Sequence, residues 1–200
     1  GAVNHNGGRI KFGPDNFLYI TTGDAQNPSL AQDKNSLAGK ILRVTDKGKV
    51  EVYSYGHRNA QGLTWDDKGQ LWATEHGPQA LDELNLIEKG KNYGWSVIQG
   101  DAEKEGMVSP IIQSGSTVTW APAGAIFYDG GIFFGGLRGE ALFEYKITDK
   151  SLKKYFKNQF GRIRAVVLGP DGYLYITTSN TDGRGNPKEG DDKLIKINPI

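Results

Sequence analysis

The sequence predicts an all-β fold, a β-propeller of four-stranded antiparallel blades, and three observations support this prediction. First, a pattern of apolar strand, polar turn and apolar strand occurs four times, in residues 9–22, 62–74, 125–134 and 164–178. Second, the turn aspartates of these copies recur every ~40 to 60 residues, which is the span of one blade; they are Asp15, Asp67, Asp129 and Asp171. Third, glycine supplies 28 of the 200 residues, which favours short strands and tight turns.

Each of the first three hairpins is followed by two more strand-like segments in which apolar and polar residues alternate. They are 40–44 and 50–53 in the first copy, 83–87 and a segment around 93–95 in the second, and 142–147 and 152–156 in the third. The fourth copy has 193–197 alone. Segment 27–39 is the best candidate for a helix, and it is short and polar. We therefore expect about four blades over residues 1–200, with the outermost strand of the last blade missing.

The two ends of the chain determine how the predicted ring of blades could close. A propeller closes when one terminus supplies the strand that the other terminus lacks. The first eight residues are rich in glycine and asparagine and do not have the pattern of that strand. An open edge promotes association. Two alternatives remain: a partial propeller completed by a missing N-terminal segment, or a smaller propeller that closes through a partner, including self-association.

Composition excludes several classes of protein. The net charge of +1 argues against a general nucleic-acid binder, which would carry a basic excess. No apolar run is long enough to span a bilayer, and the first residues lack the features of a signal peptide. The absence of cysteine excludes disulfides, thiolate metal ligands and a cysteine nucleophile. Dinucleotide, Walker, nucleophile-elbow and zinc-protease motifs are also missing.

Polar clusters lie between the predicted strands, where functional loops are expected. In 4–8, His5 is a natural proton acceptor near neutral pH, or alternatively a loop histidine that caps backbone groups. In 56–62, Arg58 and Asn59 place a permanent cation beside an amide, which suits a polar ligand. The alternative for this second cluster is an ordinary turn between two blades.

Two further clusters suggest a cation site and an anion site. Residues 75–78, with 82–83 and 92–95, combine carboxylates and backbone carbonyls, the ligands that calcium prefers, although a solvated acidic loop is the alternative. Arg162 and Arg164 point to the same side of an extended segment. Together with Arg138 they would hold a ligand that carries several carboxylates or phosphates, unless all three are ordinary surface arginines.

Taken in order, these motifs resemble the soluble quinoprotein aldose and glucose dehydrogenases, the glucose/sorbosone dehydrogenase family. The resemblance runs from His5 to Asp192. It rests on residues 4–10, 55–59, 75–78, 82–85, 92–95, 161–164 and 178–185. Residues 179–185 are closer to the broad-specificity aldose branch. The resemblance implies a six-bladed propeller that uses pyrroloquinoline quinone (PQQ) and Ca²⁺, oxidises the anomeric C1 hydroxyl of aldoses to lactones, passes electrons to an external acceptor, and is periplasmic or secreted.

The resemblance also implies roles for individual residues. His5 would be the general base, and Arg58 would stabilise charge that develops at the quinone oxygen. Carbonyl groups of Gly77 and Pro78 would bind the Ca²⁺ that touches the quinone. The other cofactor-binding residues would be Asn4, Asn59, Leu137, Arg138, Arg162, Arg164 and Asn180. A second, structural Ca²⁺ would be held by Glu83 and the carbonyl of Tyr93.

The chain departs from the family pattern at several points. Asn4 stands where the family has an aspartate, and Arg138 replaces a lysine of the glucose-specialised branch. Ser179 or Asn180 replaces an aspartate of that branch. Family members also have about two more blades before the base, including a glutamine that contacts the quinone. A non-catalytic partial or scaffold propeller and a calcium-dependent sugar lactonase are therefore the alternatives to the dehydrogenase.

Overall fold

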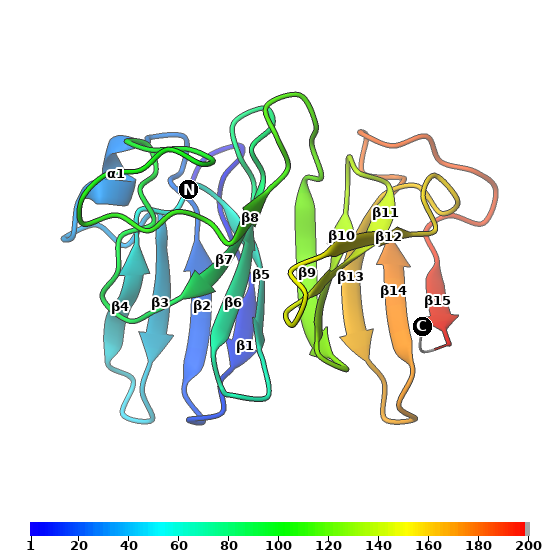
Figure 1. Ribbon diagram of the computed structural model, residues 1–200, viewed down its shortest axis with the longest axis horizontal. Helices are drawn as coiled ribbons and strands as arrows, with labels where there is room; N and C mark the ends of the chain where they lie inside the picture. Colours follow the sequence, from blue (N-terminus) through cyan, green and yellow to red (C-terminus); the bar gives the residue numbers. More distant parts are fainter. Residues whose placement is uncertain (199–200) are drawn as a thin grey trace.

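The computed structural model describes residues 1–198 and consists of four antiparallel sheets with one short helix (Figure 1). Three sheets have four strands and the last has three. Within each sheet the strands are paired in chain order, so that each sheet is a meander from its innermost to its outermost strand. The predicted all-β fold of about four blades is confirmed, and within residues 1–198 the fourth sheet has three strands.

The first sheet contains β1 (Ile10–Phe12), β2 (Leu18–Thr22), β3 (Lys40–Val44) and β4 (Val50–Tyr55). The second contains β5 (Ala60–Trp65), β6 (Leu71–Glu75), β7 (Glu83–Ile87) and β8 (Ile112–Gln113). The third contains β9 (Pro122–Tyr128), β10 (Gly131–Gly136), β11 (Ala141–Lys146) and β12 (Leu152–Tyr155). The fourth contains β13 (Ile163–Leu168), β14 (Leu174–Thr178) and β15 (Leu194–Ile197). The helix α1 (Ser29–Gln32) lies within the helix candidate 27–39.

The hydrophobic core lies between successive sheets. Between the first and second sheets, Tyr19 and Ile41 pack with Leu63, Leu71 and Ala73, all of them buried. Because apolar side chains leave water only where two sheets face each other, each sheet depends on its neighbour for stability.

Two more clusters join the remaining sheets in the same way. Between the second and third sheets, Trp72 and Leu84 belong to the same cluster as Phe134, Phe143 and Tyr145. The two phenylalanine rings of this cluster stack with their centroids 5.1 Å apart. The third and fourth sheets are joined by a cluster that contains Phe133, Leu142, Ile163, Val166, Leu174 and Ile176.

Unlike the faces between neighbouring sheets, the outer faces of the first and last sheets carry exposed apolar side chains. On β1, Ile10 and Phe12 are 63% and 70% exposed, and on β13 Val167 and Leu168 are also exposed. Within residues 1–198, none of the buried clusters joins the first sheet to the fourth. The apolar strands at the two ends of the row of sheets therefore face solvent.

Two details of the second blade differ from the sequence prediction. Asp67 lies in the turn, as predicted, but the aspartate whose side chain holds the turn is its neighbour Asp66. Asp66 is buried and accepts hydrogen bonds from the amides of Lys68 and Gln70 and from the indole of Trp72, whereas Asp67 is exposed.

The second difference from the prediction concerns the outermost strand of the second blade. Residues 93–95 do not form a strand, and the outermost strand is the two-residue β8. Tyr93 is buried and its hydroxyl donates to the Leu86 carbonyl at 2.6 Å. Gly94 has a positive φ, which turns the chain away from an extended path. Inward anchoring of the tyrosine thus replaces strand pairing here.

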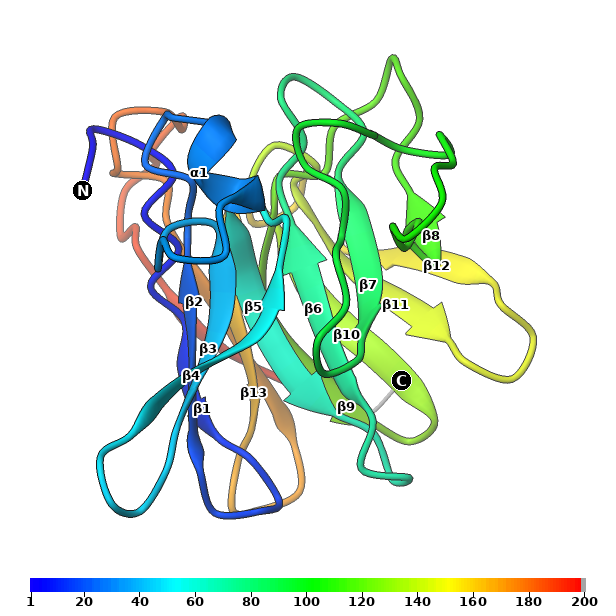
Figure 2. The same cartoon turned by 90° about the vertical axis from the view of Figure 1, so that its left-hand side faces the viewer.

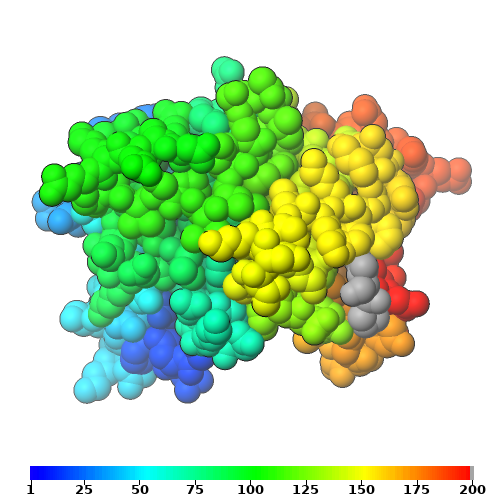
Figure 3. All heavy atoms as spheres, viewed as in Figure 1, coloured from blue at the N-terminus to red at the C-terminus, as the bar shows by residue number. Residues whose placement is uncertain are grey.

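The long connections gather at one end of the molecule and the tight hairpin turns at the other (Figure 1). Figure 2 shows α1 and the N-terminus at the loop end. The loop of residues 88–111, green in Figure 3, lies near this end and contacts the first sheet, where the amides of Gly90 and Tyr93 donate to the carbonyls of Tyr53 and Tyr55. In the described part of the chain, no helix has the length and apolarity needed to cross a membrane.

We predict that Asp66→Ala lowers the free energy of unfolding by about 2–3 kcal/mol, because two backbone amides and the buried Trp72 indole lose their acceptor. Asp67→Ala is the matched control, since that side chain is exposed, and it should change stability by less than about 0.5 kcal/mol. Urea unfolding measures both variants. Equal losses would contradict the assignment of Asp66 as the structural turn residue.

Candidate active-site cleft

Loops from all four sheets form a cleft of about 580 Å³ at the loop end. Each sheet contributes the segment around the start of its innermost strand, and three sheets also contribute the loop that follows their second strand. Ten of the thirteen predicted site residues line this cleft: Asn4, His5, Arg58, Asn59, Gly77, Pro78, Leu137, Arg138, Arg162 and Arg164.

Three predicted residues lie elsewhere. Glu83 and Tyr93 line an adjoining cavity of about 10 Å³, which is room for about one water or ion. Asn180 faces a separate depression near Glu140 and Lys193. The cleft also has lining residues that were not predicted as site residues: Gln61, His76, Gln79, Asp82, Thr119, Ala121 and Arg184.

His5 is held by a buried carboxylate. Its Nδ1 lies 2.8 Å from Oδ1 of Asp24, a residue that is completely buried. The other Asp24 oxygen accepts a hydrogen bond of 2.8 Å from the Trp95 indole. An aspartate that accepts from Nδ1–H leaves Nε2 free to take a proton. His5 therefore has the geometry of a general base.

The backbone around His5 is also tightly specified. His5 itself has a φ of 58°. Gly23, which precedes Asp24, packs so closely on the His5 carbonyl that a Cβ atom there would overlap the oxygen. The amide of Ala25 donates to this same carbonyl at 3.0 Å. Asp24 was not among the predicted site residues, because nineteen residues separate it from its partner His5 in the chain.

Glu75 fixes the backbone beneath Arg58 and Asn59. Its Oε1 accepts hydrogen bonds from both of their amides, and its Oε2 lies 2.8 Å from Nδ1 of His57. Nε2 of His57 in turn lies 2.8 Å from Oγ of Ser54. Ser54, His57 and Glu75 are all buried, so this serine, histidine and carboxylate act as a scaffold and are not reachable by a substrate.

The Arg58 side chain extends from this scaffold into the cleft wall. Its Nη1 donates to the His76 carbonyl at 3.2 Å, and its guanidinium lies 5.3 Å from the centre of the Trp95 ring. Burial lowers the pKa of Arg58, although the carboxylates of Asp24, Glu75 and Asp82 oppose this change. Its buried Nε has no hydrogen-bond partner among the described residues, so it is a donor available to a ligand.

Asp82 organises the loop that carries Gly77 and Pro78. One of its oxygens accepts from the Gly77 amide at 3.0 Å. The other accepts from the Thr119 hydroxyl and from the amides of Trp120 and Ala121, at 2.6 to 2.9 Å. Asp82 thereby ties a loop of the second sheet to the segment that enters β9 in the third. His76, beside Gly77, donates from Nε2 to the Pro122 carbonyl, and burial lowers its pKa.

Glu83 occupies an electrostatically unfavourable place. Burial raises its pKa to about 8, and the nearby carboxylate of Glu75 adds to the effect. Its carboxylate accepts a hydrogen bond from the side-chain amide of Asn85 at 3.1 Å. Within residues 1–198, no group of three or more His, Asp or Glu side chains is arranged to hold a metal ion. A cation bound here or in the adjoining cleft would therefore depend on backbone carbonyls.

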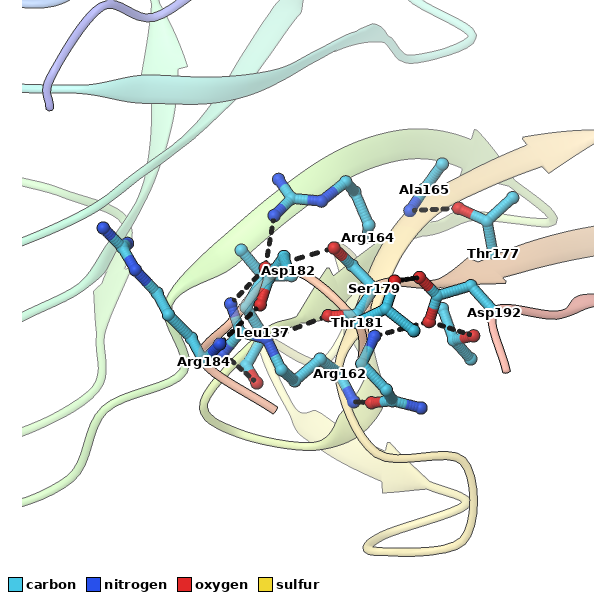
Figure 4. A network of polar contacts seen from close by, with 12 residues as sticks. Leu137, Arg162, Arg164, Ala165, Thr177, Ser179, Thr181, Asp182, Arg184 and Asp192 are labelled. Carbon is cyan, nitrogen blue, oxygen red and sulfur yellow. Dashed lines mark hydrogen bonds and ion pairs between the residues drawn. The ribbon is translucent and has the colours of Figure 1, made fainter. Parts of the chain in front are cut away.

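Arg162 and Arg164 meet at Asp182 (Figure 4). Arg162 is buried and donates from Nε to the Ser179 carbonyl and from Nη1 to the Leu137 carbonyl. Oδ1 of Asn180 accepts from the Arg162 amide at 2.8 Å. Asn180 thus positions Arg162 instead of lining the cleft.

The cleft has a strongly cationic lining. Five of its lining residues are arginines, and Asp82 is the acidic one among those of residues 1–198. The arginines come from the second, third and fourth sheets: Arg58, Arg138, Arg162, Arg164 and Arg184. Arg184 also donates to the side chain of Asn4 at 3.0 Å, which connects the last loop to the residue beside His5. Such a site favours a compact ligand with several negative charges.

Fold and cleft together define a β-propeller protein with a cationic small-molecule site and a histidine–carboxylate pair at its loop end. The chain belongs to the Glucose / Sorbosone dehydrogenase family, whose model matches residues 2–186. The predicted resemblance is confirmed.

Individual relatives agree with this assignment. The PQQ-bound aldose sugar dehydrogenase from Streptomyces coelicolor is 43% identical with a TM-score of 0.92, and the match covers 98% of this chain and 62% of that one. Aldose sugar dehydrogenase YliI of Escherichia coli K12 is 31% identical over 98% of this chain and 60% of its own length. Protein slr1608 of Synechocystis, whose function is uncharacterised, is 34% identical over 90% of this chain and 55% of its own length. The chain thus spans 55 to 62% of these relatives.

We predict that Glu75→Ala lowers the free energy of unfolding by about 3 kcal/mol or more, because two amides and a buried histidine lose their partner. Glu75→Gln should cost less, since its amide oxygen still accepts from Arg58 and Asn59 while His57 adopts the other tautomer. Glu103→Ala, an exposed control, should be nearly neutral. Thermal and urea unfolding compare the three variants, and a Glu75→Ala protein as stable as the control would refute the scaffold role.

Proposed function

We propose that this chain carries the catalytic cleft of a quinoprotein aldose dehydrogenase, which oxidises the anomeric C1 hydroxyl of aldose sugars to the lactone with PQQ as electron acceptor. The observation that carries the proposal is the His5–Asp24 pair in the same cleft as five arginines.

The lining residues fit PQQ, a compact molecule with three carboxylates. The cleft volume of about 580 Å³ is within the usual range of small-molecule sites. The unpartnered Nε of Arg58 supplies a donor that the protein itself does not use. Arginine is the side chain best suited to carboxylates, because its planar fork donates two parallel hydrogen bonds. The residues that would hold PQQ are Asn4, Arg58, Asn59, Leu137, Arg138, Arg162 and Arg164, with Asn180 acting through Arg162.

The proposed reaction removes a proton and a hydride from the sugar. PQQ, when bound, supplies the acceptor for the hydride from the anomeric carbon. Nε2 of His5 takes the proton of the hydroxyl group as the carbonyl forms. Asp24 keeps the imidazole in the required tautomer and stabilises its protonated form. The Arg58 guanidinium would stabilise negative charge at the quinone oxygen of bound PQQ.

We propose that the carbonyls of Gly77 and Pro78 bind a Ca²⁺ ion next to the cofactor. Both residues line the cleft, and Asp82 holds their loop through the Gly77 amide. Calcium is compatible with a site made of carbonyls, because it accepts oxygen ligands of mixed kinds in flexible geometry. Glu83 and the carbonyl of Tyr93 would bind a second, structural Ca²⁺ in the adjoining cavity. A cation there would relieve the unfavourable environment that raises the pKa of Glu83 to about 8.

We also propose which partners the protein has and where in the cell it acts. The exposed apolar residues of β1 and β13 offer surfaces on which further blades could pack, supplied by an N-terminal segment or by a second copy of the chain. The other partners would be an aldose and an external electron acceptor. By analogy with the family, the protein would act in the periplasm or outside the cell.

A titration of the purified chain with PQQ tests the proposed function. Binding is monitored by the change in cofactor absorbance. We expect saturable binding in the presence of Ca²⁺ and much weaker binding in the presence of a calcium chelator. Dye reduction with an aldose then measures turnover. Failure to bind PQQ at any calcium concentration would refute the proposal for this chain and favour a non-catalytic propeller.

Substitution of the base separates binding from chemistry. We predict that His5→Ala lowers kcat by a factor of roughly 10² to 10⁴, since general-base assistance is lost, while the Kd for PQQ changes little. Asp24→Asn should also lower kcat, because an amide cannot stabilise the imidazolium in the same way. Loss of PQQ binding in His5→Ala would show that His5 is a structural residue instead.

A further inference from the structure

Asp182 lies at the junction of the cleft arginines, in the loop that follows β14. Its Oδ2 accepts hydrogen bonds from Nη2 of Arg162 at 2.9 Å and from Nη2 of Arg164 at 3.1 Å. The Ser179 hydroxyl donates to the same oxygen at 3.1 Å. Figure 4 shows this carboxylate between the two guanidinium groups. It thus occupies the arrangement in which a ligand carboxylate would bind.

Hydrogen bonds favour the ionised form of Asp182. Although burial alone would raise the pKa of this carboxyl, hydrogen bonds from Arg162 and from the Arg184 amide lower it to about 2. The side chain is 24% exposed and is therefore only partly buried. The group is therefore ionised at neutral pH and neutralises part of the cationic lining.

The two arginines depend on Asp182 to different degrees. Arg162 is buried, and two carbonyls hold its guanidinium from other directions. Arg164 is 42% exposed, and in the described part of the chain Asp182 is its only side-chain partner. Removing the charge of Asp182 would consequently leave Arg162 in place and release Arg164 to bind another anion.

We propose that Asp182 is a built-in counter-ion that occupies the Arg162–Arg164 pair and gives it up when a ligand carboxylate enters, so that it sets the affinity of the cleft for PQQ. The proposal rests on the proposed function, in which these arginines hold cofactor carboxylates. It assigns to Asp182 the role of an affinity-determining residue that competes with the ligand. The cleft accordingly binds a tricarboxylate less tightly than its five arginines would allow.

The same loop connects this exchange to the base. The Arg184 amide donates to Oδ1 of Asp182 at 3.0 Å, and Nη2 of Arg184 donates to Oδ1 of Asn4, the neighbour of His5. A chain of contacts thus runs from the Asp182 carboxylate to the segment that carries His5.

The test is the affinity of Asp182→Asn for PQQ in the presence of Ca²⁺. An asparagine keeps an acceptor oxygen but removes the negative charge, so we expect binding to become roughly three- to tenfold tighter at low salt and the gain to shrink as salt screens the charges. Asp67→Asn is the matched control, because it makes the same change of charge in an exposed turn away from the cleft. Its affinity should equal that of the unmodified protein within about twofold.

A double variant tests whether the gain acts through the arginine pair. Adding Arg164→Gln to Asp182→Asn should abolish the gain in affinity, since the released arginine is then missing. Weaker binding by Asp182→Asn, or a gain that persists without Arg164, would overturn the proposal. Weaker binding would show that Asp182 instead positions the arginines for the ligand.

Citrate makes the test independent of the proposed function. This tricarboxylate has no quinone, and its binding to the unmodified protein and to Asp182→Asn is compared by calorimetry. Failure of PQQ to bind the unmodified protein would refute the proposed function alone. Tighter citrate binding by Asp182→Asn would still support the counter-ion, and equal citrate affinities would overturn it.

Discussion

The structure depends on the packing of each sheet against the next. A four-stranded meander cannot bury its apolar face by itself, and the three large core clusters each belong to two adjacent sheets. The cleft is built from loops of all four sheets, so the angles set by this packing also set the distances between functional groups. The exposed apolar residues Ile10 and Phe12 on β1 mark where this stacking stops.

A second feature organises the loops themselves. Four carboxylates, Asp24, Glu75, Asp82 and Asp182, each accept hydrogen bonds from at least two groups at the loop end. Three of them are buried, where an unpaired carboxylate would be very unfavourable. Their partners include the catalytic candidate His5 and the backbone of Arg58. Negative charges that contact the cationic lining thus hold it together, and we propose that at Asp182 such a charge also limits how strongly the lining attracts an anion.

Much of the cleft could be predicted from local sequence motifs, because the chemistry of each motif is contained in a few adjacent residues. His5, Arg58 and Arg162 were found in this way, and the structure brings all three to one cleft. The pairing of Asp24 with His5 and of Asp182 with Arg162 was not predicted, since Asp24 lies nineteen residues from His5 and Asp182 lies twenty from Arg162. Asn180 was predicted to bind the cofactor, but its side chain contacts the Arg162 amide. A motif shows which groups are present and not which way each one faces.

Period-two alternation, turn residues and the fourfold hairpin pattern were sufficient to predict the blades, since these signals arise from contacts within one sheet. They could not decide which of two adjacent aspartates, Asp66 or Asp67, turns its side chain inward to hold the hairpin. The paired arrangement of His5 with Asp24, and of Asp182 between Arg162 and Arg164, was decided by the tertiary structure alone. These contacts join segments that meet only after the sheets have stacked, so no local pattern records them.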